Sequence, residues 1–288
     1  MKTGIVILNY NDKDSVVCLT DSIAGYDTLD DIVIVDNCST DDSYEFLTQK
    51  YANQTKITVL KSEKNGGYSY GNNFGAKYLI NNKKTDIIII SNPDVLFKEE
   101  LVIKIKQGFI KNPDYGVLTG VMTKPDGSVE PIPYRNFFSY LHDLGDNLLI
   151  VRRLVYEKRV FPVDYSKEIM DVQVVQGSFF AITSKAFCDI DGLDDNIFLY
   201  YEEMILGKRL LNKGYKSGLL TNQSFIHNHS VSIRKSMKRV KMWRAMLKSK
   251  YYYQKKYNNA NVLQMALLHF MGGFSTLEKI VIEIIRLL

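Results

Sequence analysis

Apolar runs that end on polar residues alternate with amphipathic stretches along the first part of the chain. The apolar runs, each the length of a strand, are 4–10, 31–36, 57–60 and 86–90. Helical spacing or start signals occur between them at 13–25, after Ser39-Thr40-Asp41-Asp42, and at 69–82. Runs with an apolar interior are typical of strands that are buried on both faces of a parallel sheet. The pattern therefore predicts an α/β fold built from βαβ units.

The alternation breaks down after residue 123, where Pro125-Asp126-Gly127 and Pro131-Ile132-Pro133 mark loops. Later helices are predicted over 136–158, over 201–213, from 234 onward and, as a short amphipathic helix, over 277–288. A β-rich apolar segment is predicted over 172–183. No run reaches the roughly 18 apolar residues of a membrane span, so we predict none.

Composition sets broad limits. With 45% hydrophobic and 24% charged residues the chain is typical of globular proteins. Its three cysteines, Cys18, Cys38 and Cys188, lie far apart and lack the spacing of metal ligands. We expect reduced, mostly buried thiols, as in a cytosolic protein.

The positive charge is concentrated near the C-terminus. Residues 231–257 hold ten Lys and Arg and no Asp or Glu, whereas the rest of the chain is more acidic than basic. Trp243, Leu247 and Tyr251 lie among these charges at helical spacing, which predicts a helix over 233–256 that rests on an anionic membrane surface. The alternative is a helix that packs on the protein, with its charges solvated. Nucleic-acid binding is not predicted, because no recognition motif accompanies the charges.

Polar residues gather where the predicted strands end. They are Asn9, Asn11, Asp36, Asn37 and Asp94. The carboxyl ends of parallel strands share one edge of the sheet, where ligands bind. Asp94 suits a hard cation such as Mg²⁺ or Mn²⁺, which can neutralise a diphosphate, although Asn-Pro-Asp is also common turn chemistry. Asp36 could accept a hydrogen bond from a nucleotide base or a ribose, or it could cap a helix.

Residues 65–73 have the most unusual composition. Gly66 and Gly67 permit close approach of the backbone, and Asn72 and Asn73 offer amide donors near a helix start, where anions bind. The alternative is a flexible glycine turn, which does not explain the aromatic and Asn residues beside it.

Two acids and two histidines complete the candidates. Glu202 and Glu203 follow an aromatic stretch, in which burial would raise a carboxyl pKa and suit a general base. Acids in the first turn of a helix also stabilise it through the helix dipole. His227 and His229 would share one face of a strand and could hold a metal if Asp94 approached them in space.

Taken in this order, the motifs resemble those of the inverting glycosyltransferases of family 2. The similar stretches are Val6–Asn11, Ile34–Asp41, Asn65–Asn73, Ser91–Asp94, Gly177–Phe180, Asp191–Glu203 and His227–Ser232. The resemblance implies the GT-A fold, a Rossmann-like mixed sheet flanked by helices that binds a nucleotide-sugar, within residues 1–232. It implies a nucleotide-binding half over 1–123 and an acceptor-side half over 124–232. Residues 233–288 then form a helical, basic C-terminal extension.

The resemblance also implies a role for each matched residue. Donor-binding residues would be Asp36 at the base with Asn9 and Asn11 near it, Asn65, Gly66 and Asn73 at the ribose and diphosphate, and Asn92. Asp94 would hold Mg²⁺ or Mn²⁺ with help from His227. Glu203 would be the catalytic base, preceded by Glu202.

Two departures from the family pattern bear on the donor and the base. Asn92 stands where the family usually has the first acid of Asp-x-Asp, and Glu203 stands where it usually has Asp. The Asn-Pro-Asp form is similar to that of bacterial rhamnosyltransferases that use dTDP-L-rhamnose, so the resemblance favours this donor. The alternative donor is a UDP-sugar carrying galactose, N-acetylglucosamine or galactofuranose.

The resemblance implies metal-dependent transfer of a hexose by one inverting displacement. The acceptor would be a glycan, polyprenyl-linked, of bacterial cell-wall polysaccharide, capsule or O-antigen synthesis. The protein would then be cytoplasmic and peripheral at the inner face of the cell membrane. Two other classes stay open: a sugar nucleotidyltransferase, which needs a Gly-rich basic loop after the first strand, and a non-catalytic nucleotide-sugar or glycan-binding module.

Overall fold

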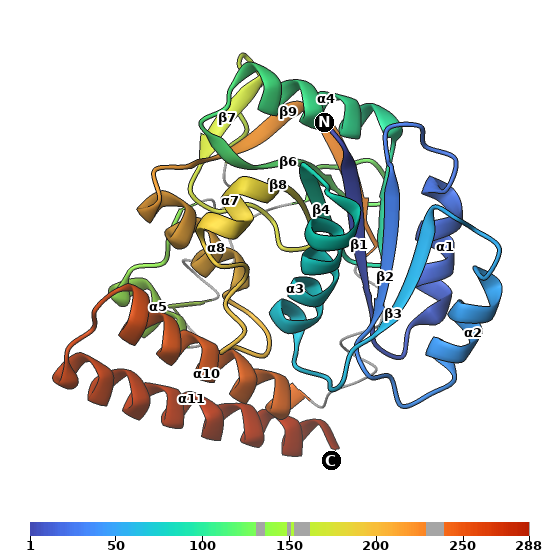
Figure 1. Cartoon of the computed structure of the whole chain (residues 1–288). Coiled ribbons are helices and arrows are strands. Elements are labelled where there is room, and N and C mark those ends of the chain that lie inside the picture. Colours follow the sequence, from blue (N-terminus) through green and yellow to red (C-terminus); the bar gives the residue numbers. More distant parts are fainter. Residues whose placement is uncertain (131–135, 149–150, 153–161, 229–238, 288) are drawn as a thin grey trace.

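The alternating pattern of the first 123 residues forms the parallel half of one sheet in the computed structural model, which describes residues 1–130, 136–148, 151–152, 162–228 and 239–287. Four strands lie in the order β3-β2-β1-β4 (Figure 1). They are β1 (Thr3–Asn9), β2 (Asp31–Asp36), β3 (Ile57–Lys61) and β4 (Ile87–Ser91). The helices between them are α1 (Lys13–Ile23), α2 (Ser43–Lys50) and α3 (Tyr68–Tyr78), which continues into the π-helical turn η1 (Leu79–Lys83). The predicted strands and helices of this half are confirmed to within a few residues.

The remaining strands extend the same sheet in mixed directions, so the two predicted halves of residues 1–232 share one nine-stranded sheet. They are β8 (Phe179–Thr183), β6 (Tyr115–Thr123), β9 (Lys216–His227), β5 (Val95–Phe97) and β7 (Ile169–Val172). The predicted β-rich segment 172–183 is in fact the end of β7 and the whole of β8, joined by residues 173–178. Because β8 and β5 run opposite to their neighbours, β8 and β5 start, and β9 ends, at the edge where β1 to β4 end.

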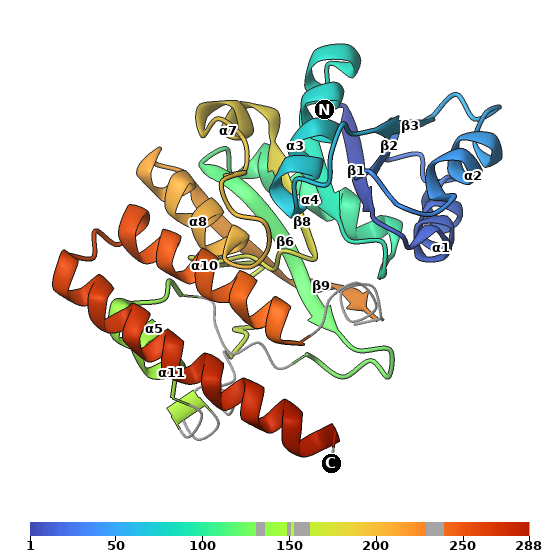
Figure 2. The ribbon, with the colours of Figure 1, turned by 90° about the horizontal axis from the view of Figure 1, so that it is seen from below.

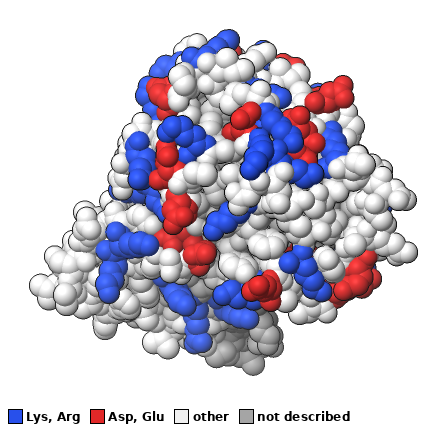
Figure 3. All heavy atoms as spheres, in the orientation of Figure 1, with Lys and Arg blue, Asp and Glu red and all other residues white. Residues whose placement is uncertain are grey.

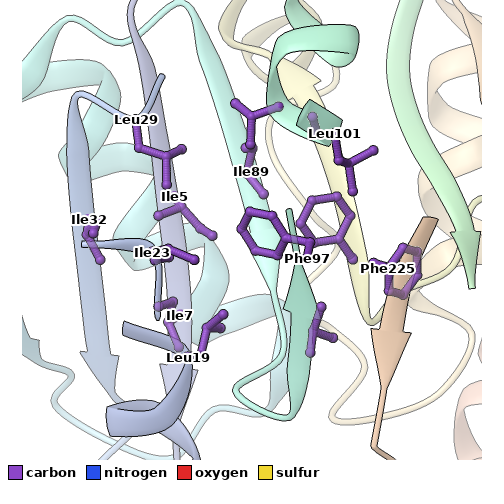
Figure 4. Packing of buried hydrophobic residues seen from close by; sticks show 14 of the residues in the cluster. Ile5, Ile7, Leu19, Ile23, Leu29, Ile32, Ile89, Phe97, Leu101 and Phe225 are labelled. Atoms are coloured by element: carbon purple, nitrogen blue, oxygen red, sulfur yellow. The ribbon is translucent and has the colours of Figure 1, made fainter. Parts of the chain in front are cut away.

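The strand residues alternate between two cores. Ile5, Ile7 and Ile32 belong to one core, which packs against α1, α2 and α4 (Glu99–Lys111) and is shown in Figure 4. Val6, Val33 and Ile88 point to the opposite face, where α3, α7 (Ser184–Asp189) and α8 (Glu202–Asn212) lie. Burial on both faces explains why the interiors of β1, β2 and β4 contain no polar residue.

The C-terminal residues form a helical hairpin of α10 (Arg239–Tyr257) and α11 (Val262–Leu287). In Figures 1 and 2, α11 is outermost and α10 lies between it and α8. The prediction of a short helix over 277–288 is wrong in length, because isolated polar residues interrupt the apolar pattern of α11 without ending the helix. The prediction that no segment could span a membrane is also wrong, because Val262–Ile282 is long and apolar enough by length and composition. Only 17% of its most apolar 18 residues are buried in the protein.

The described part of the basic segment 233–256 packs on the rest of the protein. Lys250 is fully buried, and its Nζ lies 2.8 Å from Asp146 Oδ2. Gln254 Nε2 donates to Asp143 Oδ2 at 2.6 Å, and the ring of Tyr253 packs against that of Tyr201. Two carboxylates of the segment α5 (Tyr140–Asp146) therefore anchor α10. Residues 233–238 lie outside the described residues.

Two smaller predictions are corrected. The helix predicted over 136–158 is observed as α5 from Tyr140, and most of its second half (149–150, 153–158) lies outside the described residues. The prediction of mostly buried thiols is wrong, because Cys18 and Cys188 lie on outward faces of α1 and α7 and are exposed, and Cys38 is partly exposed.

We predict that Gly75→Ala destabilises the protein by about 1–3 kcal/mol, because overpacking a rigid contact costs this much. A Cβ at Gly75 would lie 2.6 Å from Val6 Cγ1 and 2.8 Å from Val35 Cγ2, so α3 would have to lift from β1 and β2. Gly25→Ala is the matched control, since no atom lies within 4 Å of its Cβ position. Urea unfolding of the two variants measures the difference, and equal midpoints would contradict the packing argument.

Candidate active site

The ends of β1 and β2 carry a buried polar cluster. Asn9 Nδ2 donates to Asp36 Oδ2 at 2.8 Å, and the backbone N–H of Ser39 donates to Asp36 Oδ1 at 2.9 Å. Asn11, with a left-handed φ of 55°, accepts from Thr40 N at 2.8 Å and donates to Thr40 Oγ1 at 3.0 Å. The structure thus brings together Asn9, Asn11 and Asp36. Asp36 Oδ1 holds the loop after β2 and Asp36 Oδ2 holds Asn9 at the end of β1. Base binding by Asp36 stays a prediction.

The glycine turn before α3 is fixed by a neighbouring Asn. Asn37 is buried, and its Nδ2 donates to Asn65 Oδ1 and to the Gly67 carbonyl, both at 3.1 Å. Gly67 has a φ of 90°, and a Cβ there would lie 2.2 Å from the carbonyl oxygen of Phe198. This glycine is required by the backbone angle and by the close approach of the segment before α8. The alternative of a flexible turn is not favoured by these contacts.

Asn73 makes a different contact from the one that its motif predicts. Its Oδ1 accepts from Leu193 N and its Nδ2 donates to Leu193 O, each at 2.8 Å. The amide therefore joins α3 to the loop after α7 and is only 7% exposed. Its role at the ribose or diphosphate stays a prediction, and the observed pairing gives it a structural one.

Asp94 and His227 meet because β5 pairs with the end of β9, which sets Val95 opposite His227. Asp94 Oδ1 lies 3.3 Å from His227 Nε2, and their side chains are 9% and 14% exposed. Carboxylate oxygen and imidazole nitrogen both bind Mn²⁺, and oxygen suits Mg²⁺. Among the described residues no group of three or more such side chains forms a complete metal site. The pair could supply two ligands to such an ion. His229 lies outside the described residues.

The Gly177-Ser178 backbone connects the other candidates. Asn92 N donates to Ser178 O at 2.8 Å, and the Tyr68 hydroxyl donates to Gly177 O. A Cβ on Gly177 would lie 3.7 Å from Glu203 Oε2, so the carboxyl group of Glu203 lies directly beside this glycine. The glycine turn, the Asn-Pro-Asp segment and the acidic pair thus meet at two successive residues that precede β8.

The two glutamates differ in environment. Glu202 is 8% exposed, and its Oε1 has no hydrogen-bond partner. Burial first, and the charge of Glu203 second, raise the pKa of Glu202 to about 8. Burial therefore favours the protonated form of Glu202, which is a poor proton acceptor, whereas Glu203 is partly exposed. This difference favours Glu203 as the general base.

The start of α8 is held in a strained backbone. Tyr200 and Tyr201 both adopt left-handed angles, with φ of 72° and 71°, which bulky residues rarely do. The Tyr201 hydroxyl donates to Asp143 Oδ1 at 2.7 Å, and its ring is buried. Strain of this kind persists only where packing fixes it, and here it directs the two acids that follow.

Asp194 anchors the loop before α8 to the C-terminal hairpin. Its Oδ2 accepts from Tyr252 Oη at 2.9 Å, Tyr257 Oη at 2.5 Å and Lys256 Nζ at 3.1 Å, and Ser249 Oγ donates to the Leu199 carbonyl at 2.8 Å. Burial alone would raise the pKa of Asp194, but the hydrogen bonds, led by that from Tyr257, hold it well below its usual range.

The sequence-based site did not name Tyr68, Ser178 or Asp194, and it named Asn37 only as a polar residue at a strand end, with no role of its own. Asn37 and Tyr68 lie inside stretches already singled out, at a strand end and after the paired glycines, and these positions could have identified them. Asp194 could not be identified, because its partners on α10 are distant in sequence and follow no local pattern.

Comparison with known proteins shows the family to which residues 4–187 belong. The family model described as "Glycosyl transferase family 2" matches residues 4–187, which is more than half of the chain. The chain is 24% identical over 231 residues to a low-salt glycan biosynthesis hexosyltransferase of Haloferax volcanii, covering 79% of this chain and 67% of the relative. It is 24% identical over 213 residues to the N-acetylglucosaminyl-diphospho-decaprenol L-rhamnosyltransferase of Mycobacterium tuberculosis, covering 70% and 67%.

Among solved structures, a mannosyltransferase from Pyrobaculum calidifontis in complex with GDP-mannose and Mn²⁺ aligns with a TM-score of 0.60. The identity is 13%, over 96% of this chain and 72% of that one. At this identity the likeness shows the fold, and it confirms the predicted GT-A class of a mixed sheet with flanking helices.

We predict that Glu202→Gln becomes increasingly more stable than the wild type as pH rises from about 4.5 to about 8. In this window the folded protein keeps a proton on Glu202 that the unfolded chain has lost, so the free energy of unfolding falls with rising pH. Because Gln cannot ionise, the variant does not lose this free energy of unfolding, which is on the order of a few kcal/mol in the wild type. Chemical denaturation at pH 5, 7 and 9 measures the difference, with exposed Glu63→Gln as the control. A constant difference between Glu202→Gln and the wild type across these pH values would refute the assignment.

Proposed function

This chain belongs to glycosyl transferase family 2, and from that premise we propose that it transfers L-rhamnose from dTDP-L-rhamnose to a lipid-linked glycan with inversion at the anomeric carbon. The observation that carries the proposal is the junction at Gly177-Ser178. It joins the Glu203 carboxyl to the Asn92–Asp94 segment, and Asp94 contacts His227. The proposed general base and the proposed cation-binding pair therefore lie on one continuous stretch of the sheet edge.

The proposed reaction is one displacement. Glu203 takes the proton of an acceptor hydroxyl while the oxygen of that hydroxyl forms a bond to the anomeric carbon. The bond between that carbon and the diphosphate oxygen breaks, and the nucleoside diphosphate leaves with the electron pair. Asp94 and His227 would hold Mg²⁺ or Mn²⁺, which supplies charge neutralisation for the leaving diphosphate. Burial raises the pKa of Glu202, so that it would add less negative charge beside the base. The Tyr68 hydroxyl donates to the Gly177 carbonyl, which lies next to the base.

Two observations support the donor and the acceptor. The Asn92-Pro93-Asp94 sequence is similar to that of rhamnosyltransferases, and the mycobacterial relative is by name an L-rhamnosyltransferase. That name also specifies an acceptor in which a sugar is joined through a diphosphate to a polyprenol. We therefore place the reaction in bacterial cell-surface polysaccharide synthesis, such as that of capsule or O-antigen, at the inner face of the membrane.

The second candidate is a hexosyltransferase that uses a UDP-sugar. The haloarchaeal relative is named only as a hexosyltransferase, which is compatible with other donors. A non-catalytic binding module is less well supported, because a buried, partnerless carboxyl oxygen and two left-handed tyrosines cost stability and serve no purpose in simple binding.

We predict that dTDP-L-rhamnose with Mn²⁺ raises the thermal unfolding temperature more than UDP-sugars or GDP-mannose do, since a ligand that binds only the folded state stabilises it. Asp94→Asn should lose the Mn²⁺-dependent part of this increase, whereas the exposed Asp14→Asn on α1 should keep it. A larger increase with a UDP-sugar would replace the donor and keep the reaction class. No increase with any nucleotide-sugar would refute the proposal.

We predict that Glu203→Gln lowers kcat by about 10²–10⁴-fold with little change in donor binding, because general-base catalysis typically contributes this much. Glu202→Gln is the matched comparison and should lose far less, since Gln resembles a protonated Glu in shape and charge. Transfer of radiolabelled sugar to a lipid-linked acceptor measures both variants. Equal losses in the two variants would remove the distinction between the glutamates.

A further inference from the structure

An apolar stripe runs along the outer face of α11. Its members are Leu263, Leu267, Phe270, Phe274, Leu277 and Val281, each between 45% and 81% exposed. They follow one another in steps of four and three residues, so they lie on one line along the helix. The first sixteen residues of α11, Val262–Leu277, contain no Asp, Glu, Lys or Arg. A helix face that meets water usually carries charges, so this face is suited to an apolar surface.

The opposite face of α11 is already occupied. Leu268 and Ser275 are buried, and the ring of His269 stacks on Tyr251 of α10 with 4.0 Å between centroids. Tyr140 Oη of α5 donates to the Gln264 carbonyl at 3.0 Å. These contacts would be lost if α11 left the hairpin to cross a bilayer. They favour a helix that stays on the protein and presents only its outer face.

A cationic stripe accompanies the apolar one. Lys241, Arg244, Lys248 and Lys255 are exposed on α10, whereas Lys256, also exposed, binds Asp194. Their spacing places them on the face opposite the buried Ser249, Lys250 and Tyr253, and α10 has no acidic residue. Figure 3 shows the lower-left edge, where the hairpin lies, as white atoms flanked by blue side chains.

We propose that the α10–α11 hairpin docks on an anionic lipid bilayer, with the α11 stripe in the boundary of the acyl chains and the α10 cations among the headgroups. Charge complementarity selects lipid over a second copy of the chain, because pairing two copies would bring two cationic stripes closer. The stripe also lacks the flanking charged pairs that set the register of coiled coils. The proposal deepens the membrane location given in the proposed function by naming the surface that docks, and it does not depend on the donor or the reaction.

The test is sedimentation of the full chain with vesicles of phosphatidylcholine, with and without phosphatidylglycerol. The wild type should bind the vesicles that contain phosphatidylglycerol, and more weakly at high salt. Phe270→Ser combined with Phe274→Ser should weaken binding about tenfold or more, because two large apolar side chains no longer enter the lipid. Arg244→Gln combined with Lys248→Gln should weaken it by a similar factor.

Ile110→Ser is the matched control for lost apolar surface. Ile110 is 66% exposed on α4, at the opposite end of the molecule from the hairpin (Figure 1), and its variant should bind like the wild type. Unchanged unfolding temperatures show that each variant is folded. Unchanged binding of the Phe variant would overturn the proposal. So would a lipid-free dimer that the Phe variant makes monomeric, or a bound protein that resists alkaline extraction as a membrane-spanning helix does. None of these readouts requires a nucleotide-sugar, so they are separable from failure of the proposed function.

Discussion

Burial of the parallel half of the sheet on both faces is the constraint from which the site follows. Side chains of β1, β2 and β4 alternate between two cores, and neither core leaves room for an unpaired polar group. The polar side chains of the candidate site therefore lie at a strand end or just beyond it. The mixed half of the sheet then brings the starts of β8 and β5 and the end of β9 to the same edge, and with them Gly177-Ser178, Asp94 and His227.

The acidic pair is positioned by packing from two sides. On one side, the Phe198 carbonyl sits against Gly67 and accepts from Tyr68 N at 3.0 Å, which ties the loop before α8 to the start of α3. On the other side, Asp143 and Tyr253 fix Tyr201, whose left-handed backbone turns the chain into α8. The result is one buried carboxyl group with a raised pKa, Glu202, followed in sequence by one that is partly open to solvent, Glu203.

Local pattern was sufficient where structure depends on neighbours in sequence. The strand ends of β1, β2 and β4, the helix start at Glu202 and the importance of residues 65–73 could be predicted from apolar runs, caps and glycines. From the sequence, a metal site at His227 could be suggested only on the condition that Asp94 lies near it. That contact depends on three residue pairs between β5 and β9, which are more than a hundred residues apart in sequence. The contact of Asn73 with Leu193 could not be predicted either, because the two residues are far apart in sequence and no periodic pattern marks the contact. The length of α11 was underestimated because single polar residues such as Gln264 and Ser275 fit on its inner face without ending the helix.

Through Asp194 the C-terminal hairpin is a structural part of the domain and not an appendage. Three of the donors to its buried carboxylate come from α10, and the loop that it anchors leads into the acidic pair. A chain shortened before α10 would keep every residue of the sheet edge but lose the three donors that hold Asp194, and with it the loop that leads into the acidic pair. The hairpin and the sugar-transfer domain therefore have to be kept together when parts of related proteins are combined. A replacement hairpin would need hydroxyl and ammonium groups that can bind Asp194 in the same way.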